Sequence, residues 1–336
     1  MNKRRHGILC GLLAFLMLAV TACGNPSTES SSSQAQSSSS SSSSSEATVP
    51  AGTNAFLDPG FAYGFDIYGT GINGATRDLQ KTIKFQDNET PIWSLAQWYS
   101  QHKLDQGTLT LNDNLFKIED EAKSVQVNRR TGAMTMALDA SKEFTSVQTP
   151  GSVFWPHLLL EQTVAPLQFK NCTSMRAYLK FRMDRATDCS SKFGSLPIVM
   201  QAQFAWFIYV KNVNMESPGL GEFLWFGFNL YDPTKLYTST ISQQDFAGGT
   251  AGNYIYAVGA QSWLQPNTKV EIGKTVVLDV DMVKLVKKAL NVAHDAGFMM
   301  NTTIEDCAVT GTNIGFEVFD VWDIQATIFN LGVYYT

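Results

Sequence analysis

The chain has 336 residues, of which 44% are hydrophobic and 12% aromatic, and its formal net charge is −5. Because no basic surplus is present to neutralise phosphates, we expect no nucleic-acid partner and no densely anionic substrate. Neutral ligands fit this charge balance better.

The first segment has the features of an export signal. Lys3, Arg4 and Arg5 precede an apolar stretch over residues 8–20, too short for a comfortable bilayer-spanning helix. The following V-T-A-C resembles the lipobox of bacterial lipoproteins. This resemblance implies cleavage before Cys23, a lipid on Cys23 and attachment to the membrane, with secretory cleavage near Ala22 as the alternative. Removing residues 1–22 takes away three basic residues and brings the net charge to about −8.

The segment after the signal differs in composition from the rest of the chain. Residues 25–46 are mostly serine and bury nothing, which predicts a flexible tether. We therefore expect a signal peptide over 1–22, a lipidated cysteine with its tether over 23–50, and one globular domain over 51–336. The expected location is extracytoplasmic, lipid-anchored and exposed at the cell surface.

Two apolar runs dominate the domain. Phe204–Val210 and Phe223–Leu230 flank the turn-rich Asn212–Gly221, and neither run alternates cleanly, which predicts two deeply buried strands. A hairpin is expected where Ser124–Asn128 and Ala133–Asp139 flank a tight reversal. Further strands are expected at Leu109–Leu111, Lys117–Asp120, Val153–Glu161, Met175–Met183, Tyr254–Val258, Thr275–Val280, Asn313–Val318, Asp323–Phe329 and Leu331–Tyr335.

One helix is expected late in the chain. Apolar residues recur at helical spacing over Met282–Ala296, with Asp281 as N-cap and Gly297 as the stop. Many short strands and one late helix predict an all-β fold. It would be an antiparallel two-sheet β-sandwich of the jelly-roll, concanavalin-like or galactose-binding-like type.

Two glutamates stand in otherwise apolar strands. Glu222 opens E-F-L-W and Glu317 lies in G-F-E-V-F. These segments resemble the nucleophile and acid/base strands of family 12 glycoside hydrolases, which are jelly rolls. The resemblance implies retaining hydrolysis with Glu222 and Glu317 as the catalytic pair. Trp225 stands one position closer to its glutamate than in that family.

A broader resemblance covers four segments. P-I-W-S-L-A-Q-W, W-P-H-L-L-L-E-Q, F-L-W-F-G-F-N-L-Y-D and N-I-G-F-E-V-F-D-V-W-D resemble an uncharacterised group of exported bacterial sandwich domains with lectin-like or galactose-binding-like folds. This resemblance implies the architecture, and contact with sugars by analogy of fold.

Tryptophans near turns are candidate platforms for sugar rings. A helical turn would bring Trp93, Gln97 and Trp98 near one another. The candidate binding residues are Trp93, Gln97, Trp98, Trp155, Trp263, Asp232 and Trp322, with Gln162 and Asn229 as further hydrogen-bonding groups. Packing is the alternative role for each tryptophan, and it is the expected role of Trp206 and Trp225.

Cysteines and acidic residues indicate no metal centre. Cys172 and Cys189 are spaced to pair across a hairpin, a pairing left open, with Cys307 as a buried thiol. No cofactor is expected, although sandwiches of this kind can hold a structural calcium ion, whose ligands the sequence does not single out.

The sequence is compatible with three functions. The first is carbohydrate recognition without catalysis by a lipoprotein held to the membrane through Cys23. The second is retaining glycoside hydrolysis by Glu222 and Glu317. The third is a structural or protein-interaction module of the cell envelope.

Overall fold

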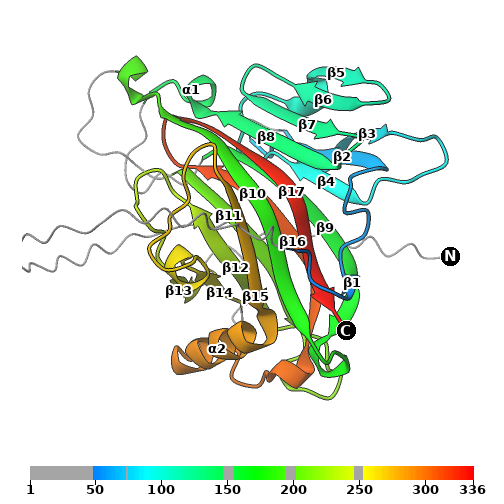
Figure 1. Ribbon diagram of the computed structural model, residues 1–336, viewed down its shortest axis with the longest axis vertical. Coiled ribbons are helices and arrows are strands. Elements are labelled where there is room, and N and C mark those ends of the chain that lie inside the picture. Colours follow the sequence, from blue (N-terminus) through cyan, green and yellow to red (C-terminus); the bar gives the residue numbers. More distant parts are fainter. Residues whose placement is uncertain (1–47, 73–74, 147–154, 194–201, 246–252) are drawn as a thin grey trace, which may run out of the picture.

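Two β-sheets face each other and form a sandwich, which confirms the expected fold class (Figure 1). The computed structural model describes residues 48–72, 75–146, 155–193, 202–245 and 253–336. The expected signal peptide, Cys23 and the serine-rich segment fall in residues 1–47, outside this part of the chain. Val153 and Phe154 of one expected strand also lie outside it.

The first sheet has eight strands and is antiparallel throughout. A short strand, β1 (Thr53–Asn54), pairs with the end of the last strand of the chain. The main path runs in the order β15 (Thr275–Asp281), β10 (Met175–Asp188), β17 (Trp322–Tyr335), β8 (Ala133–Asp139), β7 (Lys123–Asn128), β6 (Leu115–Glu119) and β5 (Thr108–Leu111).

The second sheet has nine strands. Their order is β13 (Ile241–Gln244), β14 (Asn253–Val258), β12 (Phe223–Tyr231), β11 (Ala202–Asn212), β16 (Cys307–Val318), β9 (His157–Gln168), β4 (Trp93–Ala96), β2 (Gly64–Tyr68) and β3 (Leu79–Lys84). Two of its pairs, β12 with β14 and β2 with β4, are parallel, which departs from the wholly antiparallel expectation.

The helical elements are short apart from one. They are α1 (Ala140–Glu143), α2 (Met282–Asp295) and the 3₁₀ turns η1 (Leu104–Gln106), η2 (Phe169–Asn171), η3 (Ser190–Phe193), η4 (Ala260–Ser262) and η5 (Ile304–Asp306). The expected late helix is confirmed as α2: the Asp281 side chain accepts a hydrogen bond from Lys284 N, and Gly297 has a φ of +85°. Among the described residues, no helix is both long and apolar enough to span a membrane.

Strand β11 shows why the two apolar runs did not alternate. Phe204, Trp206 and Ile208 point between the sheets and are fully buried in the main core. Ala205 and Phe207 point the other way and belong to a separate apolar cluster. Because successive side chains of a strand point to opposite faces, both faces of β11 are covered. Burying each large apolar side chain contributes about 1.5–3 kcal/mol to stability.

The expected hairpin is confirmed by β7 and β8. Val125 and Met136 are paired across it and fully buried, and Gly132 takes the positive φ of +71° in the turn. By contrast, the expected helical turn around Trp93 is wrong. Residues 93–96 form β4 between β9 and β2 because strand pairing on both sides satisfies their backbone groups.

The pairing left open between Cys172 and Cys189 is excluded by strand β10. Cys172 precedes this strand and Cys189 follows it, and both thiols are free. A strand of 14 residues is about 46 Å long. The two Cα atoms therefore lie far beyond the roughly 4–7 Å that a disulfide bridges.

A buried ion pair joins the hairpin to the chain before it. The Lys123 ammonium lies 2.8 Å from a Glu143 oxygen and 3.0 Å from an Asp120 oxygen, and it donates to the His102 carbonyl at 2.8 Å. The other Glu143 oxygen accepts from the backbone N–H groups of Gln101 and His102. This network fixes α1 against the start of β7.

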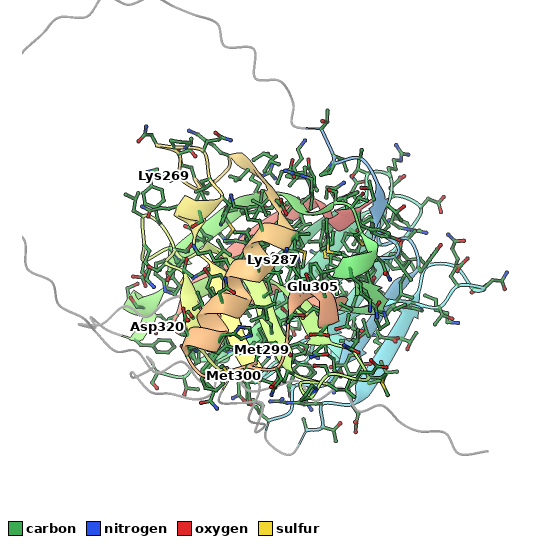
Figure 2. All side chains as sticks on the ribbon, turned by 90° about the horizontal axis from the view of Figure 1, so that it is seen from below. Lys269, Lys287, Met299, Met300, Glu305 and Asp320 are labelled. Atoms are coloured by element: carbon green, nitrogen blue, oxygen red, sulfur yellow. The ribbon has the colours of Figure 1, made fainter. Side chains whose placement is uncertain are left out.

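One end of the sandwich carries α2 and two exposed methionines. Figure 2 looks at this end and shows Lys287 on α2, with Met299 and Met300 beyond the end of the helix. Met215 and Met300 are strongly exposed, with 81% and 60% of their surface accessible. The chain enters the first sheet at the same end, where Thr53 pairs with Tyr335.

Candidate functional site

The outer face of the nine-stranded sheet, meaning the face turned away from the inter-sheet core, gathers polar side chains. Strand register places the outer-face positions of four central strands in matched rows. They are Gln203, Ala205, Phe207 and Tyr209 on β11; Glu317, Gly315, Asn313 and Gly311 on β16; Asn229, Gly227, Trp225 and Phe223 on β12; and His157, Leu159, Glu161 and Thr163 on β9. These rows define the candidate site.

Two glycines in these rows make room for aromatic rings. A Cβ atom on Gly227 would lie 2.6 Å from the Phe207 ring, and one on Gly311 would lie 2.6 Å from the Tyr209 ring. The rings therefore lie against the bare backbone of the neighbouring strands. Trp225 continues this aromatic layer, with its ring 5.0 Å from that of Tyr209.

Glu317 is the buried acid of the site. The residue is only 4% exposed, and its Oε2 has no hydrogen-bond partner among the described residues. Burial raises the pKa of this carboxyl to about 7, and the nearby Trp155 side chain acts in the opposite direction. Near neutral pH, Glu317 is therefore able to serve as a hydrogen-bond donor or acceptor.

His157 lies opposite Glu317 on the neighbouring strand. Its Nδ1 is 2.9 Å from the Trp155 carbonyl oxygen, and because a carbonyl only accepts, Nδ1 carries the hydrogen. Burial lowers the pKa of His157 to about 4, so the imidazole is neutral at pH 7 and Nε2 is an acceptor. Nε2 lies 3.7 Å from the Glu317 Oε2, too far for a direct hydrogen bond. Both groups can therefore bond to a third group.

Gln203 faces Glu317 from the other side. The two residues are directly paired across β11 and β16. Gln203 is only 2% exposed, and neither its Oε1 nor its Nε2 has a partner within the described residues. An unmade buried hydrogen bond costs about 1–3 kcal/mol, so the fold retains this carboxamide at a price in stability. The unpartnered carboxamide makes Gln203 a candidate ligand-binding residue.

Asn229 extends the polar row to β12. Its Oδ1 is buried without a partner among the described residues, and its Nδ2 lies 3.5 Å from the Ser239 carbonyl oxygen. Asn229 pairs with Ala205, next along the outer face from Gln203. We call Glu317, Gln203 and Asn229 the polar row.

Aromatic side chains surround the acid end of the row. The Trp155 ring stacks on that of Phe319 at 4.3 Å and lies 6.0 Å from the His157 ring. Tyr99 approaches His157 from the other side at 5.8 Å, with the Arg77 guanidinium 4.9 Å from the Tyr99 ring centre. Tyr99 also holds a positive φ of +58°, a conformation uncommon for a bulky residue.

The structure does not bring Glu222 and Glu317 together, which corrects the expected catalytic pair. Glu222 precedes β12 at the end of β11 where Asn212 pairs with Cys307, whereas Glu317 pairs with Gln203 at the other end. The nine positions from 203 to 212 span about 30 Å. Glu222 instead accepts a hydrogen bond from Thr302 Oγ1 at 2.5 Å. One glycosidic bond cannot lie between these two carboxyls.

Most of the other expected site residues have structural contacts. Trp93 lies in the main core and donates to the Asp58 carbonyl, and Gln97 is fully buried and bonds Tyr68, Leu104 and Asp105. Trp263 and Trp322 also pack in the main core, and Asp232 pairs with Lys235 at 3.3 Å. Gln162 bonds both backbone groups of Leu57.

Of the expected residues, Trp155 lies beside Glu317 and Trp98 contacts the neighbouring His157. The Trp98 carbonyl accepts from His157 N at 2.9 Å, and Arg77 lies 5.1 Å from the Trp98 ring centre. Sequence reasoning missed His157 and Gln203 as members of the site. The signal that could have identified them is a polar residue inside an otherwise apolar strand. This residue is His157 in W-P-H-L-L-L-E and Gln203 in Q-A-Q-F.

The described residues contain no group of three or more histidine, cysteine or acidic side chains placed to hold a metal ion. The polar row itself offers one carboxyl and two carboxamides. This set suits hydrogen bonding to a neutral, hydroxyl-rich molecule better than it suits a hard cation.

No family model and no curated protein matches the chain. Solved structures resemble it weakly. A cellulase variant derived from Cel12A of Rhodothermus marinus has 12% identity and a TM-score of 0.36, covering 69% of this chain and 97% of its own. A family 12 xyloglucanase from Bacillus licheniformis in complex with ligand has 12% identity and a TM-score of 0.35, with coverages of 72% and 99%.

A third structure is the xyloglucanase domain of NopAA, a type three effector from Sinorhizobium fredii, in complex with cellobiose. It has 9% identity and a TM-score of 0.33, covering 70% of this chain and all of its own. Family 12 is also the family that the sequence motifs resemble. Similarity at this level carries neither an activity nor a substrate over to the chain.

Proposed function

We propose that the protein is a lipid-anchored surface protein whose sandwich domain binds carbohydrate at the polar row without hydrolysing it. The observation that carries the proposal is the row itself. Buried side chains on three neighbouring strands have polar atoms without a partner in the described ranges, and aromatic rings flank them. Ligand hydroxyls both donate and accept, so they match a carboxamide and a carboxyl whose pKa lies near 7.

The neighbours of Glu317 support binding without catalysis. Glycosidases that use two carboxylates hold them about 5–10 Å apart. The residues paired with Glu317 on either side are His157 and Gln203, and neither is an acid. A single carboxyl with neutral neighbours suits recognition.

A binding experiment with matched glutamate variants tests this function. The chain from residue 23, carrying Cys23→Ser so that it remains free of lipid, is applied to a glycan array and to soluble polysaccharides in affinity electrophoresis. We expect binding by this chain, about tenfold or greater weakening by Glu317→Gln and Gln203→Ala, and no change with Glu222→Gln. Binding of no glycan, or equal loss with Glu222→Gln, would sink the proposal.

Hydrolysis is the second candidate, favoured by the raised pKa of Glu317, which suits a general acid. Its partner would be Glu161, the other acid among the outer-face positions of the four central strands. Glu161 lies four positions along β9 from His157, about 13 Å in a strand. Release of reducing ends that is lost in both Glu317→Gln and Glu161→Gln would favour this candidate over binding alone.

The membrane anchor is part of the same proposal and rests on the V-T-A-C segment. Metabolic labelling with a radioactive fatty acid should mark the wild-type chain and leave Cys23→Ala unlabelled. Label that persists in Cys23→Ala would contradict lipid attachment at Cys23.

A further inference from the structure

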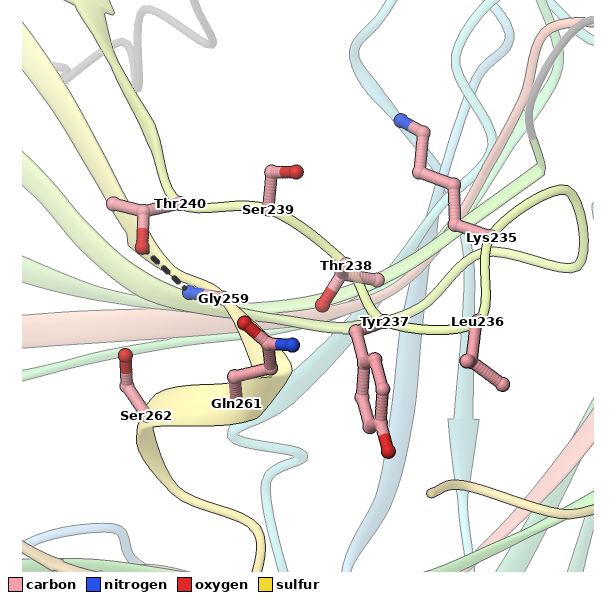
Figure 3. Close-up of a pocket in the computed structure, with 9 residues that line it drawn as sticks. All are labelled: Lys235, Leu236, Tyr237, Thr238, Ser239, Thr240, Gly259, Gln261 and Ser262. Carbon is pink, nitrogen blue, oxygen red and sulfur yellow. Dashed lines mark hydrogen bonds between the residues drawn. The ribbon is translucent and has the colours of Figure 1, made fainter. Parts of the chain in front are cut away.

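A cavity lies beside the polar row, where the loops after β12 and β14 meet. Its volume is about 620 Å³, and its lining residues are 235–240, 259, 261 and 262 (Figure 3). Five of these residues carry a hydroxyl group, one carries a carboxamide and one carries an ammonium group. The cavity is therefore predominantly polar.

The walls of the cavity are held by bonds between the two loops. Ala260 N donates to the Thr238 carbonyl at 3.1 Å and to the Thr238 hydroxyl at 3.0 Å, and Gly259 N donates to the Thr240 hydroxyl at 3.1 Å. The last of these bonds is drawn in Figure 3. Thr238 is buried and donates in turn to the Asn229 carbonyl. The cavity is thus a formed feature of the fold.

Asn229 links this cavity to the polar row. Its backbone carbonyl and its Nδ2 contact Thr238 and Ser239 of the cavity wall, while its buried Oδ1 has no partner in the part of the chain that the structure describes. On its other side, Asn229 stands next to the β11 positions that lead to Gln203 and Glu317. Asn229 therefore belongs to the polar row and also contacts two residues of the cavity wall.

The charge of the cavity favours a neutral occupant. Its single ammonium group, that of Lys235, lies 3.3 Å from the buried Asp232 carboxyl. In Figure 3 the Lys235 side chain extends away from the side on which Leu236 and Tyr237 lie. Leu236 and Tyr237 add an apolar side chain and an aromatic ring to the cavity lining. The other polar side chains of the lining carry hydroxyls, apart from the Gln261 carboxamide.

We propose that this cavity is a second subsite for the glycan bound at the polar row, taking a further neutral sugar unit of the same chain. This inference rests on the proposed function and adds the substrate class. The ligand is an oligosaccharide long enough to reach from Glu317 past Asn229 into the cavity. A monosaccharide would fill one place and leave the other without contact.

A chain-length series separates this inference from the proposed function. Binding of glucose, cellobiose and cellohexaose, and of the corresponding xylose and mannose series, is measured by calorimetry on the chain from residue 23 with Cys23→Ser. Ser262→Tyr fills the exposed cavity border, and Gln265→Tyr adds the same side chain outside the cavity. We expect the unaltered chain to bind one hexaose more tightly than its biose. Ser262→Tyr should lose about tenfold for the hexaose and nothing for the biose, and Gln265→Tyr should change neither.

Each other outcome has a distinct meaning. Hexaose binding that Ser262→Tyr leaves unchanged, or a loss shared equally by hexaose and biose, overturns the second subsite and leaves the polar row standing. Absence of binding for every sugar and length overturns the proposed function and this inference together. Gln261→Ala, which removes a polar lining group, should weaken hexaose binding in the same direction and guards against misfolding of the larger substitution.

Discussion

The His157 imidazole lies 3.7 Å from the Glu317 carboxyl, and burial drives both groups toward their neutral forms. The pKa of Glu317 rises to about 7 and that of His157 falls to about 4. An ionised pair would attract strongly, yet full removal from water costs each charge several kcal/mol. Two neighbouring neutral groups are the result.

The free energy of unfolding, measured as a function of pH, should show two opposing contributions from this pair. A carboxyl with a raised pKa stabilises the fold below its unfolded pKa of about 4.5, and that contribution is lost as the pH rises to about 7. The imidazole with a lowered pKa stabilises the fold above about 6.5 and loses that contribution as the pH falls to about 4. The two slopes cancel between pH of about 4.5 and 6.5.

Glu317→Gln should expose the histidine slope. In this variant we expect the free energy of unfolding to increase by up to about 3 kcal/mol as the pH rises from about 4 to 6.5. Glu222→Gln, which leaves the pair in place, should keep the flatter wild-type profile. Chemical denaturation at a series of pH values provides the measurement, and identical profiles for both variants would contradict the coupled burial of the two groups.

Gln203→Leu should stabilise the fold while it abolishes binding. The substitution replaces an unpartnered buried carboxamide with an apolar side chain of similar size, which should add about 1–3 kcal/mol to the free energy of unfolding. Thermal unfolding then shifts upward by a few degrees. A lower melting temperature would mean that the carboxamide has partners after all.

Gly311→Ala should destabilise the aromatic layer on the outer face. Its Cβ would meet the Tyr209 ring and the Gln162 carbonyl oxygen, each at 2.6 Å. Overpacking of this kind costs about 1–3 kcal/mol. Gly60→Ala is the control, since a Cβ at Gly60 meets nothing within 4 Å. Equal denaturation midpoints for both variants would contradict the close contact at Gly311.

Lys123→Met should be among the most damaging single substitutions. It leaves the buried carboxyl of Glu143 without its cation, and breaking a buried pair in this way costs about 3–5 kcal/mol. Lys274→Met breaks the exposed pair with Glu271 and should cost no more than about 1 kcal/mol. Equal losses of unfolding free energy for the two variants in urea denaturation would show that burial does not determine how much each ion pair contributes.

The three cysteines of the domain should differ in reactivity. Burial raises the pKa of the Cys307 thiol to about 12, and Cys172 and Cys189 are less buried. With iodoacetamide near pH of about 8, Cys172 and Cys189 should be alkylated in the native protein and Cys307 only after unfolding. Mass spectrometry without reductant gives the sites, and a Cys172–Cys189 crosslinked peptide would overturn their separation along β10.

Local patterns were enough to predict much of this fold. The β7–β8 hairpin and α2 are set by residues near one another in sequence, so turn chemistry, capping and helical spacing identified them. The two apolar runs also predicted β11 and β12 correctly, because covered strands need apolar residues on both faces.

The composition of the site was not predictable in the same way. His157, Gln203 and Glu317 meet only because β9, β11 and β16 are neighbours, and this order depends on pairing between distant segments. The predicted pairing of Glu222 with Glu317 was wrong for the same reason, because the distance between them depends on the register of β11 with both of its neighbouring strands. A shift of register moves a whole row of side chains, and no local pattern reports it.

The pairing of Thr53 with Tyr335 also places the start of the folded domain at one end of the sandwich. Tyr335 ends β17, whereas Glu317 stands just before the turn into the start of that strand, and 14 residues of strand extend about 46 Å. A chain held at Cys23 would thus be attached at one pole of the sandwich and meet its ligand near the other. Exposed Met215 and Met300 would lie near the attached end, and Glu317 would lie near the end remote from the membrane.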